Sequence, residues 1–259
     1  MRVLVTGGGT SEAIDRVRRV TNNASGRLGA LLADRFAAQP GVSQVVHLCA
    51  VDSVRPQSSG VEVETVTTVA ELAQAVRRRL TGATVDVVVH SMAVSDYRVE
   101  RVTTAADLAQ ALVGQDDPEA IRRAILAVPG LDASHKVSSA HDDLVVILRP
   151  ALKVISLFKE LAPEAQLVGF KLLDQVPLEQ LLEQARRLME VNGCDWVLAN
   201  DLSQIGPDRH VGHLLDRSGR VQRFESKPAI AEGIVRAVVE SRSQTGSVPA
   251  LDDPVGRRS

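Results

Sequence analysis

The chain of 259 residues is divided by short apolar runs rich in β-branched residues, and their spacing limits its possible folds more than any other feature. Examples are Val3–Thr6, Val45–Cys49 and Val85–Val89, none of which alternates apolar with polar residues throughout. A strand that is apolar on both faces must be covered on both faces. Because segments with helical periodicity separate the runs, the sequence predicts a mostly parallel sheet with helices on both sides.

The other predicted elements fit such a doubly wound, Rossmann-like α/β plan. Further strands are predicted at residues 61–66, 144–148, 167–173 and 196–199, and helices at 28–36, 69–80, 104–127, 152–161, 178–191 and 229–239. We expect one domain over residues 1–240, with 104–127 as a protrusion. A Ser-, Pro-, Gly- and Arg-rich tail at 241–259 is predicted to be disordered. A small β excursion at 136–148 or a hairpin at 211–224 would give edges for dimerisation.

The segment between Thr6 and the first helix is long for such a connection, at roughly eighteen residues, and long ordered loops tend to be functional. It contains Gly7, Gly8 and Gly9, then Arg18, Asn22, Ser25 and Gly26. Glycines let a backbone approach a ligand closely, and a helix N-terminus offers unpaired N–H groups to an anion. The glycines alone fit an ordinary strand-to-helix turn equally well, but the added polar residues favour a phosphate or carboxylate site.

Two common nucleotide-binding motifs are missing from this segment. The dinucleotide fingerprint needs glycine where the chain has Glu12, and no G-x-x-x-x-G-K-[ST] occurs anywhere in the sequence. Tyr97 is followed by Arg101 where a Tyr-x-x-x-Lys pair would need lysine. These absences weaken the interpretations as a dehydrogenase or a P-loop NTPase.

Composition favours small anionic ligands over macromolecules. The formal net charge is -2 and aromatic residues make up 2% of the chain, so neither a basic field nor a set of stacking platforms points to nucleic acid. No run of eighteen apolar residues occurs, no signal pattern follows Met1, and Cys49 and Cys194 are isolated. We therefore expect a reduced, cytoplasmic protein that binds neither nucleic acid nor membrane.

Polar residues follow several predicted strands at the edge where ligands bind in open α/β sheets. Residues 90–96 follow the strand at 85–89, Asn200 follows the strand at 196–199, and Phe170 and Lys171 lie in the strand at 167–173. Asp96 suits a ribose hydroxyl or a metal-bound water, and equally a simple turn. We expect this edge to face the glycine-rich segment.

The histidines and lysines indicate a functional site less clearly than the strand ends do. His210 and His213 are three residues apart in a loop-to-strand segment, which is poor geometry for a metal, so no metal site is predicted. Lysines are scarce, and Lys159 and Lys227 are interpreted as helix-surface residues. The remaining lysines are Lys136, Lys153 and Lys171.

Five segments carry a specific pattern when they are taken in chain order. They are VLVTGGGTSEAID with TNNASGRLG at residues 3–15 and 21–29, SMAVSDY at 91–97, KVSS at 136–139, GFKLL at 169–173, and ANDLS at 199–203. Together they resemble the phosphopantothenate-cysteine ligases of coenzyme A biosynthesis. Since the decarboxylase half of that family is absent, the chain is similar to the free-standing bacterial form.

The resemblance implies a ligation in two steps. The carboxylate of phosphopantothenate would attack the α-phosphate of a nucleoside triphosphate, CTP in most bacterial members, and release pyrophosphate. The amine of cysteine would then displace the nucleotide from the acyl-cytidylate. Mg²⁺ would be held mainly by the nucleotide phosphates, and the enzyme would be a homodimer that lends a loop across its interface.

The resemblance also implies residue roles. Catalytic roles fall on Asn22, which contacts the acyl-nucleotide, on Arg18, in the second step, and on Lys136. Phosphopantothenate would be bound by Gly8, Gly9, Ser25, Gly26, Gly29 and Asn200. The nucleotide would be bound by Met92, Ala93, Asp96, Lys136, Lys153, Phe170 and Lys171, with the Ala93 backbone at the base.

Three departures from the family pattern concern the charged part of the site. Ala24 replaces a serine, Ser138 replaces a second lysine, and Lys171 replaces a small residue. We hypothesise that Lys136, Lys153 and Lys171 together supply the positive charge for the triphosphate. The sequence does not decide between CTP and ATP. Two alternative functions also stay open: an NAD(P)-binding or nucleotide-sugar oxidoreductase, and a non-catalytic sensor of the same ligands.

Overall fold

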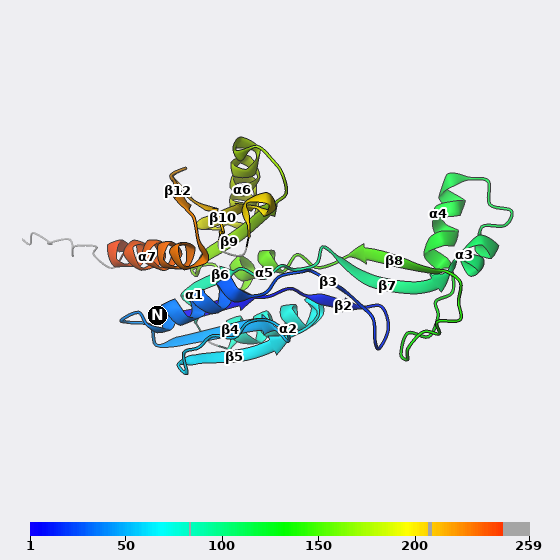
Figure 1. The fold of residues 1–259 in the computed structure, drawn as a ribbon, viewed down its shortest axis with the longest axis horizontal. Helices are drawn as coiled ribbons and strands as arrows, with labels where there is room; N and C mark the ends of the chain where they lie inside the picture. The colour runs from blue at the N-terminus through cyan, green and yellow to red at the C-terminus, as the bar shows by residue number, and fades with distance from the viewer. Residues whose placement is uncertain (83, 207–208, 246–259) are drawn as a thin grey trace, which may run out of the picture.

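The computed structural model describes residues 1–82, 84–206 and 209–245, and its centre is one eight-stranded sheet between two layers of helices (Figure 1). The strand order is β12-β11-β10-β9-β6-β1-β4-β5. The strands are β1 (Arg2–Gly7), β4 (Gln44–Ala50), β5 (Val61–Val66), β6 (Val87–His90), β9 (Gln166–Leu173), β10 (Trp196–Asp201), β11 (Gly212–Asp216) and β12 (Val221–Phe224). Among the described residues, the antiparallel pairings of this sheet are β10 with β11 and β11 with β12, and its other pairings are parallel. This arrangement confirms the predicted doubly wound fold.

Helices cover both faces of the sheet, as the continuous apolar strands require. One face carries α1 (Arg27–Ala37) and α7 (Lys227–Thr245), whose buried side chains join those of Val3 and Val5. The other face carries α2 (Val69–Thr81), α5 (Val154–Leu161) and α6 (Leu178–Asn192). The alternation of β1 side chains between these two layers is visible in Leu4, which joins the second core.

The connections place a crevice at the middle of the sheet. From β1 the chain continues outward to β4 and β5, whereas β6, β9 and β10 lie on the other side of β1. The segments that follow β1 and β6 therefore diverge at the carboxyl edge of the sheet. A doubly wound sheet binds its ligands at such a switch point.

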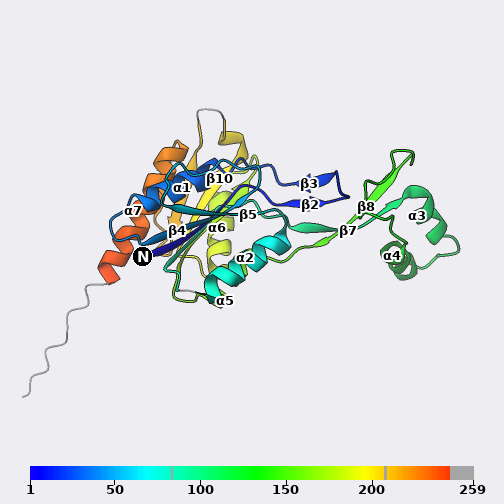
Figure 2. The ribbon, with the colours of Figure 1, turned by 90° about the horizontal axis from the view of Figure 1, so that it is seen from below.

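Two further β structures extend from this edge as a hairpin and an arm (Figures 1 and 2). The hairpin pairs β2 (Ser11–Ala13) with β3 (Arg19–Thr21), and the arm pairs β7 (Tyr97–Thr104) with β8 (Leu144–Pro150). At the far end of the arm lie α3 (Ala105–Ala111) and α4 (Pro118–Ala127), so the predicted helical protrusion is present. Asp117 caps α4 by accepting from the Ala120 N–H at 2.8 Å, as the Asp-Pro signal indicates.

The structure corrects several predicted elements. The strand over 144–148 does not make the main sheet mixed, because β8 pairs with β7 in a separate sheet, and the antiparallel strands of the main sheet are those of the hairpin at 211–224. Leu152 and Lys153 do not belong to α5, because the chain is still extended where the Ala151 N–H donates to the Asp96 carbonyl. β2, β3 and β7 were not predicted. In β7, an irregularity between Val99 and Arg101 breaks the alternation of the strand.

The last helix is longer than predicted at both ends. It begins at Lys227, because the Ser226 hydroxyl accepts from the Ala229 N–H and Pro228 is tolerated in a first turn. It runs to Thr245, so residues 241–245 of the predicted tail are helical, and 246–259 lie outside the described residues. In the described part of the chain, no helix is both long and apolar enough to cross a membrane.

Candidate functional site

A cleft of about 680 Å³ opens at the switch point of the sheet. Its walls come from the segment after β1, the first turn of α1, the segment after β6, the loop before α5, and the ends of β9 and β10. Of the residues predicted to form the site, those lining the cleft are Gly8, Asn22, Ser25, Gly26, Gly29, Met92, Ala93, Asp96, Lys153, Phe170, Lys171 and Asn200. Residues scattered over most of the sequence are thus brought to one cavity.

The floor of the cleft beside α1 is built from glycines that could not be replaced. Gly8 and Gly26 have φ angles of +87° and +72°, which L side chains rarely adopt. A Cβ on Gly26 would lie 2.6 Å from the Ser53 Cβ and 3.1 Å from the Gly8 nitrogen. Gly26 is also the N-cap of α1 and provides no side-chain cap, so the first turn keeps N–H groups for an anion in the cleft.

Backbone hydrogen bonds join the two sides of the cleft. The Ala93 N–H donates to the Gly8 carbonyl at 2.9 Å, and the Ala93 carbonyl accepts from Thr10 at 3.0 Å. The Asn22 N–H in turn donates to the Thr10 carbonyl at 3.1 Å. Gly9, which was predicted to bind substrate, does not line the cleft. It lets the backbone of Asn22 approach closely, since a Cβ on Gly9 would lie 1.9 Å from the Asn22 carbonyl oxygen. The Ala93 N–H is therefore already used, whereas its carbonyl oxygen, which accepts from Thr10, has a second lone pair that can accept from a base.

The fixed backbone of Asn22 leaves its side-chain amide available to a ligand in the cleft. Its backbone is fixed by Thr10, its side chain lines the cleft, and that side chain makes no hydrogen bond to the described residues. A side-chain amide offers two donors and one acceptor. This arrangement suits a ligand oxygen that carries negative charge.

The wall opposite α1 carries two lysines and a carboxylate. Lys153 precedes α5 and forms an ion pair with Asp96, and both side chains are about two-thirds exposed, at 68% and 67%. Lys171 lines the same cleft from β9. Deeper in, the His90 ring packs on Phe158 with centroids 4.9 Å apart, and burial lowers the pKa of His90 to about 4. The neutral ring shares a hydrogen bond with the Thr6 hydroxyl at 2.9 Å.

Arg18 lies outside the cleft and is used to join the hairpin to the arm. Its guanidinium donates to the Asp15 carboxylate at 2.5 and 2.9 Å and to the Val137 carbonyl at 2.8 Å. The Asp15 carboxylate is buried and also accepts from the Val137 N–H at 3.1 Å. The Arg18 side chain, followed by backbone hydrogen bonds, holds the pKa of Asp15 well below its usual range. Arg18 thus does not reach the cleft of its own chain, and its catalytic role stays a prediction.

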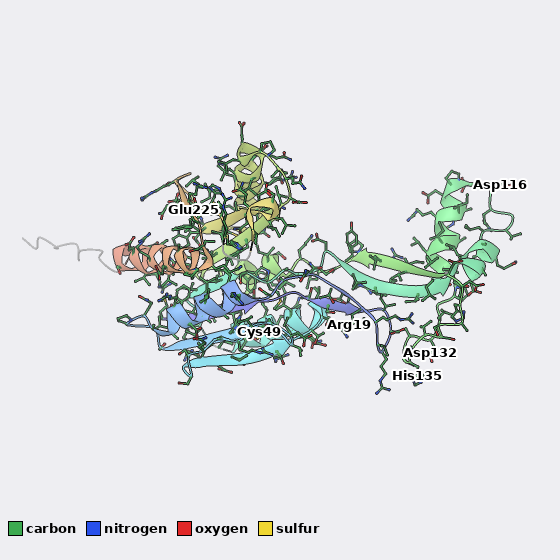
Figure 3. The ribbon with its side chains drawn as sticks, in the orientation of Figure 1. Arg19, Cys49, Asp116, Asp132, His135 and Glu225 are labelled. Carbon is green, nitrogen blue, oxygen red and sulfur yellow. The ribbon has the colours of Figure 1, made fainter. Side chains whose placement is uncertain are left out.

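Lys136 lies with Arg18 rather than with the other predicted lysines. It precedes Val137, which the Asp15 and Arg18 contacts hold against the hairpin. Figure 3 labels the adjacent His135 near the hairpin tip, well away from Glu225 near the start of α7. Within one chain, Lys136 does not line the cleft with Lys153 and Lys171, so the three lysines are not brought together.

A family model described as the DNA/pantothenate metabolism flavoprotein C-terminal domain matches residues 1–117 and 123–241. The chain belongs to this family. The resemblance found in the sequence is therefore confirmed at the level of the family. The match covers every segment that lines the cleft.

Individual relatives of this family member agree with that assignment. The chain is 33% identical over 216 residues to the coenzyme A biosynthesis bifunctional protein CoaBC of Thermococcus kodakarensis, covering 83% of this chain and 45% of that protein. The CoaBC protein of Mycobacterium bovis is 30% identical, with 92% of this chain and 52% of that protein covered. The chain thus spans about half the length of the curated relatives it matches.

Solved structures share the fold of this family member. The DNA/pantothenate metabolism flavoprotein from Streptococcus pneumoniae has a TM-score of 0.79 and 30% identity, with 93% of this chain and 99% of that chain covered. A mutant of Cab2 in complex with phosphopantothenate-cysteine has a TM-score of 0.66 and 16% identity, covering 95% of this chain and 89% of that chain. At that identity the second likeness supports the fold alone.

Lys227 and His210 are among the cleft residues of this family member that were not predicted from sequence. Lys227, interpreted as a helix-surface residue, lines the cleft from the first position of α7, and His210 lines it from the loop before β11. Asn200 links His210 to the sheet, because the Asn200 amide donates to the Val211 carbonyl at 2.8 Å and contacts His210 Nε2 at 3.1 Å. The scarcity of lysine was the one sequence signal that could have drawn attention to Lys227.

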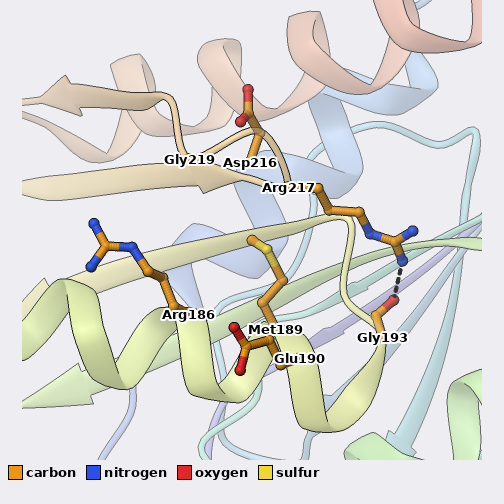
Figure 4. Close-up of a pocket in the computed structure, with 7 residues that line it drawn as sticks. All are labelled: Arg186, Met189, Glu190, Gly193, Asp216, Arg217 and Gly219. Carbon is orange, nitrogen blue, oxygen red and sulfur yellow. Dashed lines mark hydrogen bonds between the residues drawn. The ribbon is translucent and has the colours of Figure 1, made fainter.

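A second cavity, of about 380 Å³, lies between the end of α6 and the turn before β12 (Figure 4). Its charged residues hold the local fold together. Arg217 donates to the Gly193 and Cys194 carbonyls at 2.8 and 3.0 Å and so caps α6. Asp216 accepts from the backbone N–H groups of Ser218 and Arg220. We assign no ligand to this cavity, and the described residues contain no cluster of His, Cys, Asp and Glu for a metal.

Three histidines of the fold predict how its stability depends on pH. Burial lowers the pKa of His47, His90 and His210 to about 4 each, and the charge of Arg55 adds to this at His47. The unfolded chain binds these protons below about pH 6.5, whereas the fold does not. The free energy of unfolding should therefore fall as the pH drops from 6.5 to 4, by on the order of 1 kcal/mol per pH unit for each histidine.

Urea unfolding followed by the fluorescence of buried Trp196 at pH 7.5, 6 and 5 measures this effect. His47→Leu should flatten the dependence, since both ring nitrogens of His47 are buried without a partner among the described residues. His141→Leu, at an exposed position, is the matched control and should leave it unchanged. A stability that stays constant from pH 7.5 to 5 would contradict the neutral assignment of these rings.

Proposed function

We propose that this chain is a phosphopantothenate-cysteine ligase that works through an acyl-nucleotide, with CTP as co-substrate. The observation that carries the proposal is the cleft itself. It joins the uncapped start of α1 to a wall with two lysines, and Asn22 lines the same cleft. The family description, which names pantothenate metabolism, and the names of the bifunctional relatives, which state coenzyme A biosynthesis, support this substrate class.

The phosphopantothenate half would lie beside α1. The N–H groups of the first turn at Gly26 and Gly29 suit a phosphate, which carries about two negative charges at neutral pH. The Asn22 amide would donate to the carboxylate and then to the acyl phosphate formed from it. Such donors stabilise charge that develops during reaction and need no protein nucleophile.

The nucleotide half would lie against the segment from Met92 to Asp96. Lys153 and Lys171 would face the triphosphate, and Phe170 would pack near it. Because the Ala93 carbonyl is the backbone group left to accept, it favours a base with an amino group, such as cytosine. Mg²⁺ would neutralise phosphate charge, and Asp96, the only carboxylate among the described residues lining the cleft, could hold it through water.

The two steps balance without any further reactant. A carboxylate oxygen of phosphopantothenate forms a bond to the α-phosphorus of CTP, and the bond from that phosphorus to the β-phosphate bridge breaks to release pyrophosphate. The cysteine nitrogen then bonds to the acyl carbon, CMP leaves, and the amine proton passes to solvent. Positioning and charge stabilisation are what the cleft supplies to both steps.

Pyrophosphate release should require phosphopantothenate and should be fastest with CTP. We expect ATP to be slower, and UTP, which lacks an amino group, to be slower than CTP by about tenfold or more, as expected for one lost hydrogen bond in a site built for it. A coupled pyrophosphate assay with the four nucleotides, each with and without phosphopantothenate and cysteine, measures this. Release that is independent of phosphopantothenate overturns the proposal, and binding without release would indicate a sensor.

The Asn22→Asp variant tests the role of the Asn22 amide in the same assay. It keeps the size of the side chain but replaces a donor with an acceptor that repels the acyl phosphate. It should fold normally, as shown by an unchanged thermal melting curve, and release pyrophosphate much more slowly. A rate equal to that of the wild type would remove Asn22 from the mechanism.

We further propose that a second copy of the chain completes the cleft. Lys136 and Arg18 lie together outside their own cleft, on a hairpin and arm that extend from the body. Tyr97 and Leu148 on the paired arm strands are 54% and 42% exposed, so the arm has apolar surface to bury against a partner. In a two-fold dimer, each arm could then bring Lys136 to the partner's nucleotide.

Mixing two inactive variants should restore activity if Lys136 acts across the dimer. In a mixture of Asn22→Asp and Lys136→Ala subunits, half of the dimers are mixed, and each mixed dimer has one intact site out of two. Full exchange of subunits should therefore recover about a quarter of the wild-type rate. If Lys136 acted within its own chain, every site would retain one defect and the mixture would stay inactive. A mixture that stays inactive after exchange, shown by mass spectrometry of tagged subunits, contradicts the proposal.

A further inference from the structure

The cleft contains an ammonium group and a ring nitrogen that have no partner among residues 1–82, 84–206 and 209–245. Lys227 makes no hydrogen bond or ion pair with the described residues. His210 has a buried Nδ1 that is likewise without a partner in the described part of the chain. Both residues line the same cleft, and the charge of Lys227 is felt at the His210 ring. Buried polar groups without partners are uncommon in folded proteins, so His210 Nδ1 calls for a ligand, and the half-buried Lys227 lines the same cleft.

The hydrogen bonds of Asn200 decide which nitrogen of His210 carries the proton. The Asn200 Nδ2 group contacts the Val211 carbonyl, which can only accept, so this atom is the amide nitrogen. Nδ2 must then also be the donor to His210 Nε2, at 3.1 Å. A neutral imidazole that accepts at Nε2 carries its hydrogen at Nδ1. The unpartnered Nδ1 is therefore a donor, and its natural partner is an oxygen with negative charge.

The position of the pair in the fold separates it from the nucleotide. Lys227 begins α7, which packs beside α1 on one face of the sheet. Lys153 precedes α5 on the other face, and Lys171 follows Phe170 along β9, so its side chain points away from the α1 and α7 layer. Lys153 and Lys171 thus lie on the opposite face of the sheet from Lys227. The pair of His210 and Lys227 shares its face with the Gly26 helix start.

We propose that His210 and Lys227 bind the phosphate of phosphopantothenate, together with the first turn of α1. This assignment rests on the proposed function and identifies the residues that distinguish phosphopantothenate from pantothenate. A phosphate has three oxygens that each accept hydrogen bonds, and an ammonium, a ring N–H and helix N–H groups supply donors from different sides. Asn200 acts as a positioning residue for His210, because it fixes the protonated nitrogen of the ring.

Isothermal titration with phosphopantothenate and with pantothenate tests the assignment directly. Lys227→Met and His210→Ala should each weaken phosphopantothenate binding by about 10- to 100-fold and leave pantothenate binding unchanged. His210→Asn should restore much of the affinity, since an Asn amide can accept from Asn200 and still donate. Arg236→Met removes an exposed cation from the same helix outside the cleft and should have no effect.

Steady-state kinetics give the second measurement. The same two variants should raise the KM for phosphopantothenate and leave the KM for CTP and for cysteine unchanged. Equal affinities for phosphopantothenate in wild type and both variants would overturn the phosphate site alone. A rise in the KM for cysteine without one for phosphopantothenate would assign the pair to the cysteine carboxylate and also overturn it. A wild type that binds no phosphopantothenate would overturn the proposed function and the subsite with it.

Discussion

The close contact of backbone segments at the end of β1 is the constraint on which the site depends. Gly8 could carry no side chain, because a Cβ would lie 2.7 Å from the Ala50 Cβ and 2.9 Å from the Ser53 Cβ. Gly26 meets the same Ser53 from the start of α1. Since the Gly8 carbonyl also accepts from Ala93 after β6, one residue connects the helix start to the opposite wall. The two halves of the cleft therefore form one rigid unit, which is what positioning two anionic substrates requires.

The buried polar groups of the cleft follow from that geometry. His47 lies directly behind the glycines, where a Cβ on Gly7 would come within 2.7 Å of its Nε2. His47, His90 and His210 are kept neutral by burial, so the positive charge of the cleft comes from Arg27 and the lysines. The cations are divided between the two faces of the sheet. This division would keep the phosphate of one substrate apart from the triphosphate of the other while their reacting ends meet near Asn22.

The sequence correctly predicted the features of the fold that are determined by local residue patterns. Apolar strands, the helix start after Gly26 and the residues around Asn22 and Met92 were placed correctly, because strand ends of a doubly wound sheet share one edge. Arg18 does not reach the cleft of its own chain, because its position depends on a contact with Val137, far along the chain. Lys227 was missed for the same kind of reason, since its place in the cleft depends on α7 packing beside α1. Such long-range contacts leave no periodic signal in sequence.

The central claim is that the cleft activates the carboxylate of phosphopantothenate as an acyl-cytidylate. Phosphopantothenate labelled with oxygen-18 in its carboxylate tests this most directly, with mass spectrometry of the products after turnover with CTP and cysteine. The account predicts one labelled oxygen in the phosphate of the released CMP, because the carboxylate oxygen bonds to the α-phosphorus and leaves with it. Product formed with unlabelled CMP, or with the label in inorganic phosphate, would contradict it.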